Sequence, residues 1–382
     1  MRQNRILYLA AMFAMFAAGV LAQSNSSGGN AHSGKTFFNV DFPNVHSNGR
    51  SCATCHVPEE AFQLTPAHVE ARFQALQLAR QTDPSADDPL FRSVDANDGA
   101  EDFTNLRKHA LVRIFIPLPT DASGRKLMWP QDDPNATVVS VWRATPTIWN
   151  TAFTGPYQLD ARFNTLQEQA IGALINHAEI THAPKTKFLN DVAAFQMTQF
   201  SSPAVKLLSE ALARGQTPGP TDPPLNELEQ RGRVIFDHHC INCHGGPTQT
   251  VPLPGLPPGI RNIRVSKPVQ PFAAEFPFLP SPIPPRNWVF RDGETLTVRP
   301  STDPGQALLT GNIAHLNFFD INTLYGISKT APYFHDNSAA TLEDVLRHYQ
   351  SDFKAAGKVA PIPPALLLDE EIPPLLAYLK KI

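Results

Sequence analysis

All four cysteines of this 382-residue chain fall into two copies of one five-residue pattern, C-x-x-C-H. The cysteines and the histidines that follow them are Cys52, Cys55, His56, Cys240, Cys243 and His244. Two thiols spaced in this way, with a histidine directly after them, are typical of covalent haem attachment, in which the histidine binds the iron. The sequence therefore predicts two c-type haems, with His56 and His244 as the proximal iron ligands.

Two other uses of the cysteines compete with haem attachment. An exported chain can pair its cysteines in disulfides, but each cysteine here lies two residues from its neighbour, so the bond would close a strained ring. A zinc site needs four ligands around one ion, so the two motifs would have to converge although Cys52 and Cys240 are far apart in the chain. Haem attachment uses every cysteine and is the favoured interpretation.

The N-terminus is typical of an export signal. Arg2 and Arg5 precede the apolar run "ILYLAAMFAMFAAGVLA", and Val20-Leu21-Ala22 fits a small-residue cleavage site. We expect residues 1–22 to be a signal peptide and the mature protein to be periplasmic. A retained anchor is the alternative, but the run is shorter than the ~20 apolar residues of a usual membrane span. No stable membrane span is therefore expected.

The charge balance excludes one class of partner. Lys and Arg number 32 against 35 Asp and Glu, which gives the chain a formal net charge of −3. Nucleic-acid-binding domains usually carry a basic surplus. We therefore expect no nucleic-acid partner.

A Pro/Gly-rich stretch, "RGQTPGPTDPPLNE", separates the two motifs and is typical of a linker. It predicts an N-terminal haem domain at residues 23–218 and a C-terminal haem domain at residues 219–382. Apolar residues in "NELEQRGRVIFDHHCINCH" follow helical spacing, as in the first helix of a cytochrome c fold, whereas the segment before the first motif is more loop-like. The Pro-rich residues 251–285 are interpreted as an extended connection, and no internal repeat is apparent beyond the haem motifs.

Residues 57–142 exceed what a minimal cytochrome c needs, so we interpret them as a large insertion in the first domain. The insertion contains an expected helix at 66–81 and a strand-like run at 111–118. Its acidic stretch Asp95–Asp102 lacks the glycine and glutamate positions of an EF-hand loop and is interpreted as a solvated turn. The fold class expected is mainly α: two cytochrome c-like haem domains with long loops and this insertion.

Four blocks of the sequence resemble the bacterial dihaem cytochrome c peroxidases and the related MauG-type dihaem oxidases. They are "GKTFFNVDFPNVHSNGRSCATCH", "TPTIWNTAF…LDARFNTLQEQAIGALINHAEI", "GRVIFDHHCINCHGG" and "INTLYGISKTAPYFHDNSAATLEDVLRHY". The resemblance covers most of the mature chain except the insertion. It implies two mainly α-helical cytochrome c-like domains, of which the first haem is the peroxide site and the second takes in electrons.

The resemblance also implies an acid–base group for peroxide cleavage at Glu179, with Gln169 beside it. The residues themselves indicate a helix that opens with a capping box formed by Thr165 and Glu168. Gln169 falls in the first turns of this helix, and Glu179 falls just past its expected end. Without the resemblance, both would be read as surface residues.

The sixth ligand of the second haem is expected to be Tyr349. In the peroxidases a methionine lies fourteen residues after the histidine of the "YFHD" block, which is His335 here, and that position holds Tyr349. The mature chain has only Met128 and Met197, and both precede the second motif. Helical spacing after Thr341 places Tyr349 on the apolar face. A packed core tyrosine is the alternative, and His348 is a weaker ligand candidate.

Other positions depart from the family pattern. The tryptophan that usually lies between the haems aligns with Leu159, so Trp142, Trp149 or Tyr157 would have to substitute for it. The backbone carbonyls of Thr330 and Pro332 match two ligands of a calcium ion, but the asparagine ligand aligns with Ala144. A distal histidine has no match, because the usual offset holds Arg72 and because His68 and His109 are interpreted as surface residues. We therefore expect an open first haem, and calcium stays in doubt.

Three functions remain open from the sequence. The first is a periplasmic peroxidase that reduces hydrogen peroxide with electrons from a small cytochrome c or cupredoxin. The second, which Tyr349 favours, is a MauG-type oxidase that uses peroxide to oxidise a protein or organic substrate. The third is a non-enzymatic dihaem electron carrier, which predicts two six-coordinate haems and no reaction with peroxide.

Overall fold

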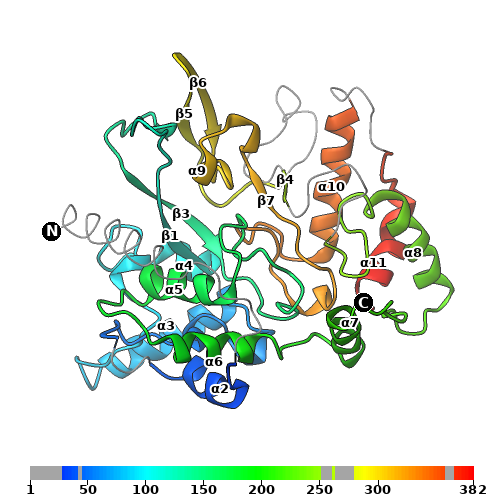
Figure 1. Ribbon diagram of the computed structural model, residues 1–382, viewed down its shortest axis with the longest axis horizontal. Coiled ribbons are helices and arrows are strands. Elements are labelled where there is room, and N and C mark those ends of the chain that lie inside the picture. Colours follow the sequence, from blue (N-terminus) through cyan, green and yellow to red (C-terminus); the bar gives the residue numbers. More distant parts are fainter. Residues whose placement is uncertain (1–27, 42–44, 251–259, 263–278, 358–364) are drawn as a thin grey trace.

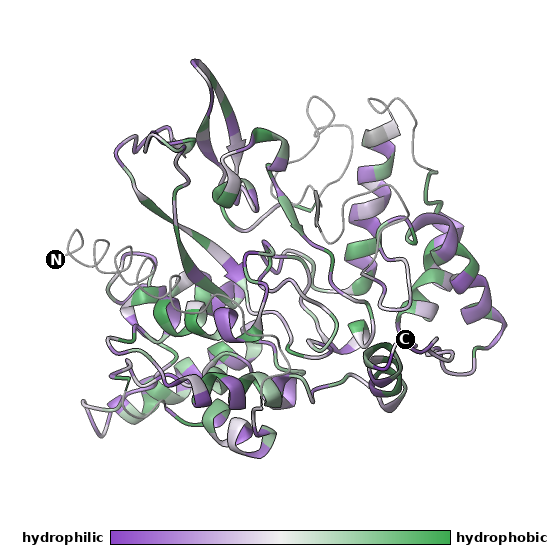
Figure 2. Cartoon of the chain, viewed as in Figure 1, coloured by the Kyte–Doolittle hydropathy of each residue, from purple (hydrophilic) through white to green (hydrophobic). Residues whose placement is uncertain are grey.

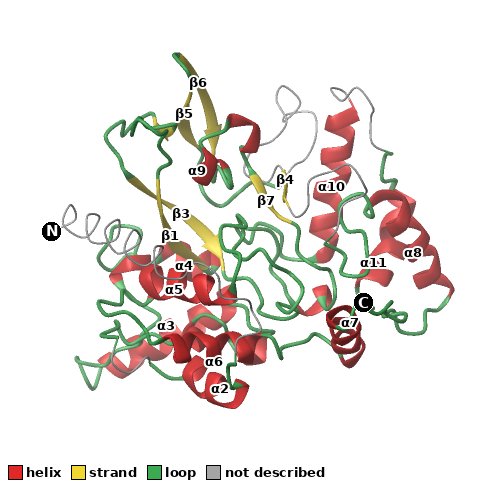
Figure 3. Ribbon diagram, viewed as in Figure 1, coloured by secondary structure: helices red, strands yellow, loops and turns green. Residues whose placement is uncertain are grey.

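The structure is a computed structural model that describes residues 28–41, 45–250, 260–262, 279–357 and 365–382. The expected signal peptide and most of the Pro-rich connection lie outside these residues. Helices predominate over strands among the described residues, so the mainly α character is confirmed. Figure 3 shows the strands grouped between and above two sets of helices.

The helices form two groups, one from each half of the chain (Figure 1). The first group consists of α2 (Ala31–Asn39), α3 (Pro66–Arg80), α4 (Thr104–His109), α5 (Leu166–His177) and α6 (Thr186–Gln196). The second group consists of α8 (Glu227–His239), α10 (Leu342–Gly357) and α11 (Ile372–Leu379), with α7 (Pro203–Ala213) nearby. The short α9 (Ala307–Thr310) lies beside the strands.

Three small antiparallel sheets connect these groups. β1 (Leu111–Pro117) pairs with β3 (Val138–Ala144), so that Leu111 lies opposite Ala144. β2 (Met128–Pro130) pairs with β5 (Arg286–Asp292), which pairs in turn with β6 (Thr295–Ser301). β4 (Ile260–Asn262) pairs with β7 (Phe318–Asp320). The sheet of β2, β5 and β6 therefore joins segments from both halves of the chain.

Local sequence signals set the ends of the main helices. The Thr65 side chain accepts from the His68 amide at the start of α3, and the predicted helix at 66–81 is confirmed to within one residue. The capping box of Thr165 and Glu168 opens α5 as expected. The strand-like run at 111–118 forms β1. The segment before the first motif is more helical than expected, because α2 extends through "GKTFFN".

One helix pair in each half crosses at a glycine. A Cβ added to Gly34 in α2 would lie 1.9 Å from the Asp191 carbonyl oxygen in α6, and one added to Gly232 in α8 would lie 1.9 Å from the Pro374 carbonyl oxygen in α11. Only glycine allows so close an approach between the two backbones. α11 is hydrophobic along most of its length (Figure 2) and packs its apolar side on α8.

The largest hydrophobic cluster crosses the predicted domain boundary. It contains buried residues of segment 57–141, including Leu64, Val69 and Ile116, together with Trp288 and Phe290 of β5. The segment that we interpreted as an insertion therefore packs against residues of the C-terminal half and is not an isolated appendage.

An internal repeat lies beyond the haem motifs, contrary to our expectation. "PYQLDARFNTLQE" starts at residue 156 and "PYFHDNSAATLED" at residue 332, an offset of 176. In each copy the tyrosine forms an antiparallel bridge six residues on, Tyr157 to Phe163 and Tyr333 to Ala339. The next residue has a positive φ, 72° at Gln158 and 70° at Phe334. A threonine-capped helix follows in both copies, α5 and α10.

Candidate haem sites

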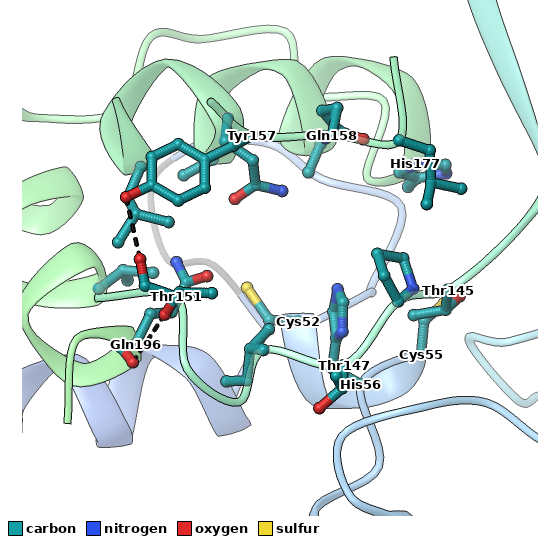
Figure 4. A pocket seen from close by; sticks show the side chains of 18 of the residues that line it. Cys52, Cys55, His56, Thr145, Thr147, Thr151, Tyr157, Gln158, His177 and Gln196 are labelled. Carbon is teal, nitrogen blue, oxygen red and sulfur yellow. Dashed lines mark hydrogen bonds between the residues drawn. The ribbon is translucent and has the colours of Figure 1, made fainter. Parts of the chain in front are cut away.

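A large cavity lies beside the first motif. It encloses about 1350 Å³ of space that no atom fills, part of which opens to solvent. Cys52, Cys55 and His56 lie along one side of this cavity, and Gln158 and His177 lie on the opposite side (Figure 4). Because both thiols and one imidazole of the C-x-x-C-H motif face a single cavity, the residues fit a covalently attached haem.

The ring of His56 is oriented by the backbone. Its Nδ1 lies 3.0 Å from the Phe62 carbonyl oxygen, and the Pro146 carbonyl also faces the ring. Burial lowers the pKa of His56, so the ring is neutral. A histidine that donates one ring N–H to a carbonyl leaves its other nitrogen free to bind a metal. His56 is therefore oriented as a proximal ligand would be.

The second motif repeats this arrangement. His244 Nδ1 lies 3.2 Å from the Gln249 carbonyl oxygen, and the Asn322 carbonyl also faces the ring. Asn322 follows Pro146 by the same 176 residues as the repeat. Burial lowers the pKa of His244 to about 4. Both histidines are therefore neutral because they are buried, and both make equivalent contacts with backbone carbonyls.

The four thiols do not come together in one place. Among the described residues, which include all four cysteines, no group of three or more His, Cys, Asp or Glu side chains could hold a metal ion. Burial raises the pKa of Cys52 to about 12 and that of Cys55 to about 11, so both are protonated thiols at neutral pH. The zinc alternative therefore lacks a site within the described residues at which the two motifs could share one ion.

Tyr349 lies on α10 close to the second motif. The nearby Cys243 and Cys240 contribute to raising the pKa of the Tyr349 phenol, although burial is the larger cause. Its ring lies 6.1 Å from the Phe334 ring and 6.0 Å from the Phe353 ring, measured between centroids. His348 is fully buried beside it, and its ring lies 5.0 Å from that of Phe334.

The two candidate acid–base residues differ in position. Gln169 lines the first cavity. Glu179 is not among the residues that line it, and one carboxylate oxygen of Glu179 accepts from the Asn48 side chain at 2.9 Å. The Glu179 backbone has φ 50°, in the left-handed region, which ends the turn after α5.

The remaining candidates from the sequence also divide into residues that line the first cavity and residues that lie outside it. Leu159 and Tyr157 line the first cavity, whereas Trp142 and Trp149 do not. Arg72 binds Asp88 and donates to the Thr54 carbonyl at 3.1 Å, so it contacts the first motif from outside the cavity. His68 lies 3.4 Å from the Glu60 carboxylate, outside the cavity. His109 ends α4, outside the cavity.

The calcium candidates bring few oxygen atoms together. Thr330 is buried, and its hydroxyl donates to the Ile327 carbonyl at 3.1 Å. Pro332 offers only its carbonyl, and Ala144 has no side-chain oxygen. Calcium takes six to eight oxygen ligands. Two backbone carbonyls are not such a set, so calcium stays an untested prediction and no step of the mechanism uses it.

Sequence reasoning missed the anchor of the first motif. Arg50 is almost completely buried, and its Nη1 lies 2.6 Å from Asp95 Oδ2. Its other nitrogens donate to the carbonyls of Pro89 at 2.8 Å and Leu90 at 2.6 Å. The interpretation of Asp95–Asp102 as a solvated turn was therefore wrong for Asp95, which is fully buried. The 57–142 segment thus holds the chain just before Cys52.

Two further cavity residues were not singled out from the sequence. His177, the last residue of α5, lines the first cavity, and burial lowers its pKa to about 4. Asp320, at the end of β7, lines the same cavity although it comes from the C-terminal half. Burial, with a smaller contribution from the nearby Asp160, raises the pKa of Asp320 to about 8. A buried carboxyl group on a cavity wall can hold a proton at neutral pH.

Residues 34–202 match the di-haem cytochrome c peroxidase family. The match spans less than half of the chain and includes the first C-x-x-C-H motif. A curated relative, the cytochrome c551 peroxidase of Nitrosomonas europaea, is 27% identical over 221 residues. The match covers 53% of this chain and 56% of the relative, so the chain spans little more than half the length of the curated peroxidase it matches.

The solved structures to which this chain is similar include a MauG-like protein and a diheme peroxidase. A MauG-like protein associated with microbial copper homeostasis has a TM-score of 0.47 at 19% identity, with 92% of this chain and 87% of that chain covered. The diheme peroxidase BthA from Burkholderia thailandensis E264 has a TM-score of 0.42 at 16% identity, with coverage of 92% and 85%.

Within the described part of the chain, no helix is both long and apolar enough to cross a membrane.

Proposed function

We propose that the protein is a periplasmic dihaem c-type peroxidase. It reduces one hydrogen peroxide to two waters, with two protons and two electrons from a small cytochrome c or cupredoxin. When bound, the first haem would supply the site at which the peroxide O–O bond breaks, and the second would take in the electrons. The family match of residues 34–202 and the two C-x-x-C-H motifs support this assignment.

The observation that carries the proposal is a difference between two equivalent positions. Tyr349 on α10 follows Ala173 on α5 by the 176 residues of the internal repeat. Ala173 lines the first cavity. A methyl group cannot bind iron, whereas a phenol can. The first haem would therefore keep an open position for peroxide, while Tyr349 closes the second.

The residues have separate tasks at the first haem. When bound, the haem supplies the redox chemistry. Cys52 and Cys55 would hold it covalently, and His56, oriented by the Phe62 carbonyl, would bind its iron. Gln169, on the cavity wall, can donate a hydrogen bond to peroxide. The family resemblance assigns proton transfer to Glu179, which is bound to Asn48.

The domain assignment accompanies this proposal. Residues 23–218 would form the peroxidatic unit, including the 57–142 insertion, and residues 219–382 the electron-transfer unit. The two matched helix pairs that cross at Gly34 and Gly232 support one cytochrome c-like unit in each half. The signal peptide at 1–22 would direct the chain to the periplasm.

A MauG-type oxidase is the second candidate function, and Tyr349 is the specific residue that favours it. A tyrosine ligand stabilises oxidised iron more than a neutral methionine does. Such a site is suited to storing oxidising equivalents that later oxidise a protein or organic substrate. Leu159 at the usual tryptophan position removes one route between the haems. Of the substitutes Trp142, Trp149 and Tyr157, Tyr157 is the one that lines the first cavity.

One experiment separates the candidate functions. The diferric holoprotein is mixed with one equivalent of peroxide, and its absorbance spectrum is followed with and without a reduced donor. Rapid turnover only with the donor supports the peroxidase. A long-lived oxidised spectrum without the donor supports the oxidase. No spectral change under either condition leaves the electron carrier and overturns the proposal.

A further inference from the structure

Two exposed histidines lie against each other outside the first cavity. His46 is in the loop that precedes the first motif, and His182 is in the connection between α5 and α6. The centroids of their rings are 4.4 Å apart, and the ring planes are inclined by 32°. Neither residue lines the first cavity. The haem chemistry proposed above therefore makes no use of this pair.

The backbone brings the two histidines together. The amides of Thr181 and His182 both donate to the carbonyl of Val45, at 3.1 Å and 3.2 Å. Val45 is buried in the same hydrophobic cluster as Ile180. The His46 backbone has φ 50°, in the left-handed region, where histidine is one of the few residues other than glycine that is enriched. The fold therefore fixes where both imidazoles start before any ligand binds.

The spacing of the rings is close to that of two imidazoles that share one metal ion. A bond from zinc to an imidazole nitrogen is about 2.0–2.1 Å long, so the ring centres of two neighbouring ligands of one ion lie roughly 4.5–5 Å apart. The centroids of His46 and His182 are separated by 4.4 Å. Only small side-chain rotations are needed to turn one nitrogen of each ring toward a common ion.

One of the two rings is already oriented by a further contact. Nδ1 of His182 lies 3.0 Å from the hydroxyl oxygen of Thr181. A histidine that binds a metal usually makes a hydrogen bond through its other ring nitrogen, which fixes the orientation of the ring. Among the described residues, no third His, Cys, Asp or Glu side chain joins the pair. Because both rings are exposed, water can complete the coordination of an ion.

We propose that His46 and His182 form a surface site for one divalent transition-metal ion and bind Cu²⁺ more tightly than Zn²⁺. Imidazole nitrogen suits both ions, and Cu²⁺ lies above Zn²⁺ in the general order of affinities. Mg²⁺ prefers oxygen ligands and is excluded. The ion would link the loop that carries Asn48 to the turn that carries Glu179, whose side chains bind each other at 2.9 Å. This site does not depend on the proposed peroxidase function.

Calorimetric titration of the diferric holoprotein with ZnCl₂, CuSO₄ and MgCl₂ tests the site. We expect wild type to bind one equivalent of Zn²⁺ here, Cu²⁺ more tightly, and no Mg²⁺. His46→Asn and His182→Gln should each lose this equivalent. Asparagine is chosen at position 46 because it also tolerates a positive φ. His32→Gln, at an exposed histidine of α2, is the matched control and should bind as wild type does.

A third variant tests the orientation of the ring. Thr181→Val removes the hydroxyl and keeps the amide that donates to Val45. Loss of such a supporting contact typically weakens metal affinity by about 10–100-fold, and we expect a fall of this size. Wild-type affinity in Thr181→Val would refute the role given to Thr181. Wild-type binding in either His46→Asn or His182→Gln would overturn the site, and so would a wild type that binds neither ion, because the rings would then only stack.

Discussion

The backbone amide of Ala144 donates to the carbonyl of His335 at 2.7 Å, across the two halves of the chain. The amide of Asp320 donates to the carbonyl of Leu159 at 2.8 Å. Asp320 follows Ala144 by 176 residues, and His335 follows Leu159 by the same number. Each half therefore donates one backbone hydrogen bond to the other half at an equivalent position. This is expected for two repeats related by an approximate two-fold axis.

Haem content tests the doubled motif. We expect two covalent haems per chain in a pyridine haemochrome assay on the exported protein. The double variant Cys240→Ala/Cys243→Ala should retain one, because the cavity beside Cys52 and Cys55 does not use the second motif. A wild-type value of one haem or none would contradict the assignment.

Replacing Tyr349 should change the second haem alone. Tyr349→Met should raise the reduction potential of that haem, because a neutral thioether favours ferrous iron more than a tyrosinate does. Tyr349→Phe should leave a position that water can fill. Potentiometry with EPR measures both. The matched control is Tyr333→Phe, which removes a hydroxyl bound to the Ile327 carbonyl at 3.0 Å in the same half. If potential and EPR signal stay as in wild type, Tyr349 is only a core residue.

A tyrosine at Ala173, the position of the first unit that is equivalent to Tyr349, should close the first haem site. Ala173→Tyr places a phenol on the wall of the first cavity. We expect the reaction with peroxide to slow at least tenfold and the ferric spectrum of the first haem to change. Ala75→Tyr, at an exposed position of α3, is the control for the added side chain. An unchanged rate and spectrum in Ala173→Tyr would mean that the two helices are not equivalent toward their haems.

Asp320 should make folding stability depend on pH. Burial raises the pKa of its carboxyl group from 3.8 to about 8. The folded state therefore binds this proton more tightly than the unfolded state, and the free energy of unfolding should decrease as the pH rises from about 4 through 8. Asp320→Asn should flatten this part of the profile, whereas Asp133→Asn at an exposed position should not. Denaturation in urea at several pH values measures it, and parallel wild-type and Asp320→Asn profiles would refute the assignment.

The buried ion cluster around Arg143 should be sensitive to substitution. Arg143 lies 2.6 Å from Asp160 and 2.6 Å from Asp303, and all three are buried. Arg143→Met leaves two buried carboxylates with one cation fewer, which typically costs about 3–5 kcal/mol of stability. Arg125→Met breaks only exposed pairs with Asp121 and Glu294 and should cost below about 1 kcal/mol. Equal midpoints of urea unfolding for the two variants would be the contrary result.

Local features of the fold were predictable because the residues that decide them are neighbours in sequence. The capping box of Thr165 and Glu168 fixed the start of α5, and Thr65 fixed the start of α3. The strand-like run at residues 111–118 predicted β1. The repeat escaped notice because its shared signals, a tyrosine followed by a positive φ and a capped helix, are clear only as backbone geometry.

The residues of the candidate site were predictable only where a sequence motif is diagnostic of their chemistry. Cys52, Cys55 and His56 carry their own signature, but His177 is placed on the cavity wall by Arg50 and Asn48, which lie far from it in the chain. Asp95 was misread because a run of acidic and glycine residues normally stays in water. Burial beside Arg50 reverses that expectation, since a paired charge can leave water. Asp320 enters the first cavity from the other half, which no local pattern could indicate.

The pairing of β2 with β5 has a consequence for how the chain can mature as it is synthesised. Met128 of the first half has its strand partner at Phe290, which is synthesised much later. Until residues 286–301 arrive, β2 has no neighbour and the cluster around Trp288 is incomplete. The first haem motif would therefore stay accessible to the enzymes that attach haem until most of the polypeptide has emerged. A shortened chain ending at the linker would expose the unpaired edge permanently.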